Sequence, residues 1–239
     1  MSRHHRPSLL EAYLSSLVLV AMLTQAPSTP SAEPKSAPPP RNVTVLSQNG
    51  VVAADHPMAS AVGAAILERG GSAADAGVAT LLTLGVVNPF ASGLGGGGFC
   101  LHRDAETGAV EALDYREVAP AAASRDMYVV DGKVDSDLSR YGGLAVGVPG
   151  EPAGLWALHK RYGRMPWAAL VDPARQLAAR GFLVGELLPQ RLRAKDEELS
   201  PLPPFRQAFA PSGEWVAPME VLRRPDLART LARLRDEGP

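Results

Sequence analysis

Arg116 is the residue whose type and surroundings point most directly to chemistry. It lies between two acids, Asp114 and Glu117, just after a predicted strand. Arginine carries a planar fork of N–H donors that fits a carboxylate in a bidentate arrangement. Two interpretations stay open from these residues alone. Arg116 binds a carboxylate ligand, or it pairs with a neighbouring acid, and the spacing favours the pairing.

A run of glycines, Gly93–Gly98, precedes the two strands that lead to Arg116. It satisfies the G-x-G-x-x-G pattern of dinucleotide-binding proteins, but that fingerprint needs a strand before it and a helix after it. Here a predicted helix comes first and a strand follows, so we reject a nucleotide site. Consecutive glycines permit positive φ angles and leave backbone N–H groups open. The run therefore either packs two chain segments tightly or faces a ligand.

Composition excludes several other classes of site. The single Cys100 lies in an apolar run, which predicts a small buried side chain rather than a nucleophile. The sequence has no His/Cys cluster with the spacing of metal ligands, and we predict neither a metal nor an organic cofactor. A net charge of −1 argues against a nucleic-acid partner.

The first 41 residues are predicted to lie outside the folded domain. Basic residues at positions 3–6 and a short apolar run at 14–23 indicate a secretory signal peptide over residues 1–26. An uncleaved membrane anchor is the alternative, although the run is too short to span a bilayer. Residues 27–41, rich in Pro, Ser and Ala, indicate a disordered linker. The folded domain then covers 42–239, and we expect a secreted or periplasmic protein.

The elements that must position Arg116 begin with a predicted pair of short strands in 42–54, around a turn at 48–50. Pro57 then opens a helix that two glycines end near residue 70. Ser72 and Asp75 form a capping box for the next helix. That helix, up to Val87, is apolar nearly all round, which predicts burial between layers.

The second half of the chain alternates turns and helices. Strands over 99–102 and 109–114 would place Arg116 at the end of a strand. Further along we predict a hairpin over 127–134, helices over 151–162, 166–181, 186–194 and 225–234, and a proline-interrupted surface loop over 201–211.

Taken together, these motifs resemble those of the gamma-glutamyltransferase family, also called glutathione hydrolases. The agreement covers nearly all of the chain after residue 42. It is carried by the stretches Gly50–Pro57, Ile66–Asp75, Val87–Pro89, Ser92–Phe99 and Asp114–Pro120.

The resemblance implies an α+β fold, the α-β-β-α sandwich of N-terminal-nucleophile hydrolases, of which this chain holds the N-terminal portion. In this family a threonine with its own free amine as base attacks a γ-glutamyl amide, and water or an acceptor amino acid resolves the acyl-enzyme. By the match to the family motif, Arg116 binds the α-carboxylate of the glutamyl donor, and the resemblance reverses the preference for simple ion pairing. Tyr115 stands where the family usually has Phe.

The family's catalytic threonine is expected beyond residue 239, because Thr80, Thr83 and Thr230 lie within predicted helices. We therefore interpret the chain as the N-terminal part of a large subunit, inactive alone, with apolar surface exposed. Its expected partners are γ-glutamyl substrates such as glutathione and a C-terminal half with the small subunit, with membrane contact only through the signal segment. The alternatives are a related superfamily amide hydrolase (an acylase) and a non-catalytic binding module.

Overall fold

The computed structural model describes residues 44–239, so the predicted signal peptide and linker lie outside the described residues. Contacts divide the chain into two units, residues 1–44 and 45–239, and every element below belongs to the second. Among the described residues no helix has the length and apolar character needed to cross a membrane.

Both of the first two helices begin where predicted, at Pro57 and after the Ser72–Asp75 capping box. Helix α2, Pro57–Glu68, begins where His56 Nδ1 accepts a hydrogen bond from the Met58 N–H at 3.2 Å. Helix α3, Ala73–Val87, begins with the capping box: Ser72 Oγ accepts from the Asp75 N–H at 3.1 Å, and Asp75 Oδ2 accepts from the Ser72 N–H at 2.9 Å. Eleven of the fifteen residues of α3 are buried, which confirms the predicted central helix.

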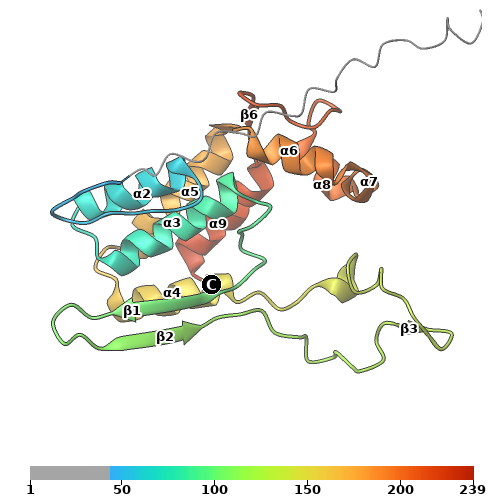
Figure 1. The fold of residues 1–239 in the computed structure, drawn as a ribbon, viewed down its shortest axis with the longest axis horizontal. Coiled ribbons are helices and arrows are strands. Elements are labelled where there is room, and N and C mark those ends of the chain that lie inside the picture. Colours follow the sequence, from blue (N-terminus) through green and yellow to red (C-terminus); the bar gives the residue numbers. More distant parts are fainter. Residues whose placement is uncertain (1–43) are drawn as a thin grey trace, which may run out of the picture. The chain divides into compact units, whose positions relative to one another are not determined.

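Three more helices complete the packing around α3. Helices α4 (Glu151–Tyr162) and α5 (Trp167–Arg180) both contact α3, and α9 (Pro225–Glu237) packs along α5. Figure 1 shows α2, α3, α5 and α9 as one group, with α4 between them and the strands β1 and β2. The core of this helical layer consists of apolar side chains that are almost completely buried, including Ile66, Val78, Leu82, Leu155, Leu170 and Leu231.

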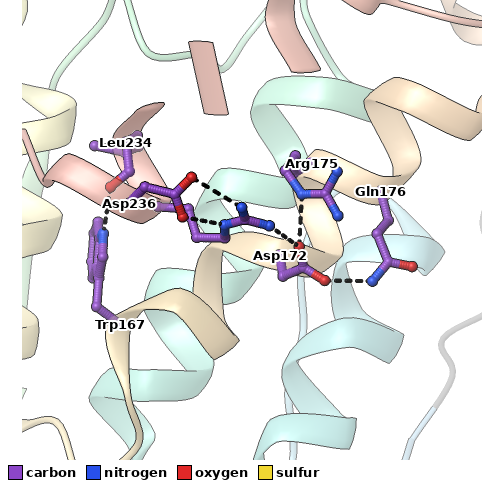
Figure 2. Close-up of polar contacts among 7 residues, drawn as sticks. Trp167, Asp172, Arg175, Gln176, Leu234 and Asp236 are labelled. Carbon is purple, nitrogen blue, oxygen red and sulfur yellow. Dashed lines mark hydrogen bonds and ion pairs between the residues drawn. The ribbon is translucent and has the colours of Figure 1, made fainter. Parts of the chain in front are cut away.

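A polar clasp joins α5 to α9 (Figure 2). Asp172 accepts hydrogen bonds from Arg175 Nε at 2.7 Å and Arg235 Nη1 at 3.1 Å, and also from Gln176. Burial alone would raise the pKa of Asp172, but these three donors lower it to about 2. Nearby, Trp167 Nε1 donates to the Leu234 carbonyl at 2.8 Å. The clasp fixes the position of α9 along α5.

The strands form three small antiparallel pairs. Strand β1 (Phe99–Arg103) pairs with β2 (Val110–Asp114), with Phe99 opposite Asp114. The other pairs are β3 (Val129–Val130) with β4 (Lys133–Val134), and β5 (Phe182–Leu183) with β6 (Val221–Leu222). A 3₁₀ turn, η1, covers Gly143–Ala145. In Figure 1 the chain between β2 and α4 runs away from the helices.

The β1–β2 hairpin has two unlike faces. One face, with Cys100 and Leu113, packs against the helical core, and burial raises the pKa of the Cys100 thiol. The other face leaves Phe99 70% and Leu101 76% exposed, with Val110 beside them. Cys100 is thus a partly buried side chain facing the core.

The structure contradicts two predicted elements. The predicted strands fail over residues 44–54, which form no strand and leave Leu46 exposed, because a strand needs a neighbour and none lies beside this segment in the described part of the chain. The predicted loop over 201–211 contains helix α8, Pro203–Phe209, with Phe209 buried. Its prolines lie in the first turn, where a missing N–H costs no helical hydrogen bond. The short helices α6 (Leu187–Ala194) and α7 (Asp196–Leu199) precede it.

Candidate functional site

A hollow of about 720 Å³ opens beside Arg116. The glycine run Gly93–Gly98 forms one wall, and the segment Tyr115–Glu117 with Glu151 forms another. A third wall comes from the end of α3 and the start of α9, where Phe90 and Arg224 line it. Segments that lie far apart in the sequence therefore meet around one space.

The structure confirms close packing for one part of the glycine run and leaves another part facing open space. A Cβ on Gly97 would collide with the backbone of Tyr115, so Gly97 serves close packing. That contact continues in two hydrogen bonds, in which the Tyr115 N–H donates to the Gly98 carbonyl at 3.0 Å and the Gly98 N–H donates to the Tyr115 carbonyl at 3.3 Å. Gly95, by contrast, lines the hollow, and a Cβ there would meet no atom within 4 Å. The run thus holds Tyr115 in place with one part and faces open space with another.

Arg116 lines the hollow and also forms the ion pair with a neighbouring acid that the spacing favoured. Its side chain is 56% exposed, and its Nη1 lies 3.3 Å from Glu117 Oε2. Asp114 instead accepts a hydrogen bond from the backbone N–H of Arg116 at 3.0 Å, which shapes the turn after β2. One ion pair engages one side of the guanidinium, so the remaining donors are available to a ligand carboxylate.

Two carboxylates share the hollow with Arg116, and neither was predicted from the sequence to be a site residue. Glu151 begins α4 and is only 8% exposed. Burial raises its pKa to about 7, and the charge of Glu117 adds to the effect. Burial and the charge of Glu151 also raise the pKa of Tyr115 to about 12. The Glu-Pro pair at 151–152 is an ordinary helix start, so no local signal marks Glu151 as a member of this group.

Arg224 is the second arginine that lines the hollow, and it too was not predicted from the sequence to be a site residue. It precedes α9, and its guanidinium lies over the ring of Phe209 at 4.7 Å from the centroid. Burial lowers its pKa, against the opposing charge of Asp226. Within residues 44–239 it forms no ion pair. Because it is more than a hundred positions from Arg116 in the sequence, only the tertiary structure brings the two to the same hollow.

The hollow offers charged groups for binding rather than an imidazole-activated nucleophile. Ser92 lines it, but no histidine or lysine does among the described residues. In the same part of the chain, no group of three or more His, Cys, Asp or Glu side chains could hold a metal ion. Two guanidinium groups in a partly enclosed space suit a ligand with carboxylates.

Comparisons with known proteins agree on one family. The model of the family described as gamma-glutamyltranspeptidase matches residues 59–239. Glutathione hydrolase 3 of Arabidopsis thaliana is 44% identical over 195 residues, which are 82% of this chain and 30% of that protein. Among solved structures, gamma-glutamyltranspeptidase of Helicobacter pylori has a TM-score of 0.78 at 35% identity, over 82% of this chain and 56% of that chain. The cephalosporin acylase from Bacillus halodurans has a TM-score of 0.73 at 29% identity, over 86% and 39%.

These similarities confirm the predicted resemblance and the predicted fold class, an α+β N-terminal-nucleophile hydrolase sandwich of which this chain holds part. The chain spans about a third of the length of the curated relatives it matches.

Proposed function

Because the chain belongs to the gamma-glutamyltranspeptidase family, we propose that it supplies the donor-binding part of an enzyme that cleaves γ-glutamyl amides such as glutathione. The observation that carries the proposal is Arg116, a guanidinium held after β2 at the wall of the hollow with donors left over from its pair with Glu117. In this role Arg116 binds the α-carboxylate of the glutamyl group, because a planar fork of donors matches a carboxylate.

The chemistry itself belongs to groups beyond this chain. A threonine outside the 239 residues attacks the amide, with its own amine as base, and forms the acyl-enzyme that water or an acceptor amino acid resolves. The C-terminal half with its small subunit is then the partner that completes the site, and the chain alone is inactive. A signal peptide over residues 1–26 exports the protein to a periplasm or to the outside of the cell.

The direct test is Arg116→Ala in the complete enzyme. Losing a charge-assisted bidentate contact should lower kcat/KM for a γ-glutamyl anilide by about 10- to 100-fold, mainly through KM. Arg116→Lys keeps the charge but loses the fork, so it should recover only part of the loss. The matched control is Arg125→Ala, because Arg125 is 94% exposed and within residues 44–239 pairs with Asp126 alone. A KM that stays at the wild-type value in Arg116→Ala would remove this residue from the site.

The similarity to cephalosporin acylase favours a second candidate function, hydrolysis of another kind of amide. A pair of donors separates the two. A γ-glutamyl anilide carries the α-carboxylate, and a 4-aminobutyryl anilide has the same chain without it. If Arg116 binds that carboxylate, the wild-type enzyme should prefer the first donor, and the preference should disappear in Arg116→Ala. Equal rates for both donors in the wild type would favour the acylase function.

A further inference from the structure

We propose that Arg224 is a second carboxylate-binding group of the hollow, and that it selects donors that carry a carboxylate on the leaving group as well as on the glutamyl group. The proposal rests on the proposed function of the hollow as the donor site. Glutathione is a donor of this kind, because its glycine ends in a free carboxylate.

Position is the first argument. Arg116 and Arg224 line the same hollow from different walls, one after β2 and the other before α9. The hollow's volume of about 720 Å³ exceeds the space that one amino-acid head group needs. A ligand held by its glutamyl carboxylate at Arg116 therefore extends along the glycine wall, and the other end of an extended peptide has a guanidinium to meet.

The surroundings of Arg224 are the second argument. The backbone N–H of Arg224 donates to the Ala178 carbonyl at 2.8 Å, which anchors the residue to the end of α5. The face of the guanidinium lies on Phe209, so that its N–H donors are left at the edges. Its acidic neighbour Asp226 is engaged by Arg229. The Arg224 guanidinium is thus positioned by its contact with the ring of Phe209.

Charge is the third argument. A partly buried guanidinium loses hydration, and an anion that binds it restores favourable electrostatic interactions. No carboxylate pairs with Arg224 in the region that the structure describes. Arg191 lies over the ring of Phe90, at 5.8 Å from the centroid, but does not line the hollow. The wall with Arg224 has no lining carboxylate among the described residues, whereas the wall with Arg116 also carries Glu117 and Glu151.

The test uses the complete enzyme with two donors of nearly equal shape, glutathione and the carboxamide of its glycine. Wild type should prefer glutathione. Arg224→Gln removes the charge and should lower the ratio of the two kcat/KM values about tenfold. Arg224→Lys keeps a positive charge and should lower the ratio less, and it serves as the decisive variant if the Gln form does not fold. Arg233→Gln, at an exposed position of α9 paired with Glu237, is the matched control and should keep the wild-type ratio.

Three results would overturn the proposal. They are an unaltered ratio in Arg224→Gln, an equal fall for both donors (the result expected if a protein carboxylate pairs with Arg224), and a loss in Arg224→Lys as large as that in Arg224→Gln.

Calorimetry with both donors separates this proposal from the proposed function. If glutathione binds and Arg224→Gln weakens that binding selectively, but no turnover occurs, only the proposed function fails. If neither donor binds to the wild type, both proposals fail.

Discussion

The helical layer and the β1–β2 hairpin differ in how far they bury their apolar side chains. In the layer, apolar side chains of α3, α5 and α9 are almost completely buried, and its main polar clasp at Asp172 has several partners. The hairpin buries one face and leaves Phe99 and Leu101 in solvent. The stability of the chain therefore resides in the helices, while the hairpin carries Arg116 to the hollow.

The strongest test of this contrast compares two leucines in the 239-residue chain. Leu170 is 0% exposed, so Leu170→Ala should lower the free energy of unfolding by about 3 kcal/mol, through lost burial and a residual cavity. Leu101 is 76% exposed, so Leu101→Ala should change it by less than about 0.5 kcal/mol. Urea unfolding followed by circular dichroism measures both. Losses of similar size would mean that the hairpin contributes to the cooperative core.

Removal of a buried carboxylate inside the helical layer, that of Asp75, should give the next largest loss of stability. Asp75 Oδ2 accepts hydrogen bonds from the N–H groups of Ser72, Arg164 and Met165, so that one carboxylate joins the start of α3 to the loop before α5. Asp75→Ala should cost about 2 kcal/mol, because buried donors lose their acceptor.

Hydrogen exchange checks the mechanism at Asp75. The amides of Arg164 and Met165 should lose protection in Asp75→Ala before the rest of the layer does. Asp126→Ala is a suitable control, since that side chain is 72% exposed. Unaltered protection at both amides would show that the Asp75 carboxylate contributes little.

The smallest of these effects concerns Glu151, where the layer faces the hollow. Its pKa rises from 4.5 to about 7 in the folded chain. Between those values the folded state binds more protons than the unfolded state, so the free energy of unfolding falls as the pH rises from about 4.5 to 7. Above pH 7 the wild type bears the cost of an ionised buried carboxylate. Glu151→Gln removes that cost and should stabilise the chain by about 1–2 kcal/mol at pH 8, after allowance for partial solvent screening.

Unfolding at pH 4.5 and pH 8 measures the effect of Glu151→Gln. The difference between variant and wild type should be small at pH 4.5 and reach its full size at pH 8. Glu106→Gln, at an exposed position in the β1–β2 turn, controls for the loss of a charge alone. A variant that is less stable than the wild type at pH 8 would mean that the ionised Glu151 has a favourable partner.

Elements with strong local signals could be predicted from the sequence. The capping box of Ser72 and Asp75, the glycine stop after α2 and the hairpin after β1 all depend on residues a few positions apart. The errors came where local signals were ambiguous or partners were needed. Prolines near residue 203 start a helix rather than break one, and the segment 44–54 has strand composition without a neighbouring strand.

Arg116 could be predicted as a site residue from the sequence because its flanking motif is continuous, from Asp114 to Pro120, and its binding role stays a prediction. By itself, the sequence determined most of the helices, though not α8, together with the strand that ends beside this arginine and the family. Only the tertiary structure decided which groups surround the hollow. Glu151 and Arg224 reach the hollow from the starts of two different helices. Burial there raises the pKa of Glu151 and lowers the pKa of Arg224. The physical reason is the distance along the sequence between the residues that interact. Caps and turns form between neighbouring residues, whereas desolvation and the meeting of distant charges depend on how the whole chain packs.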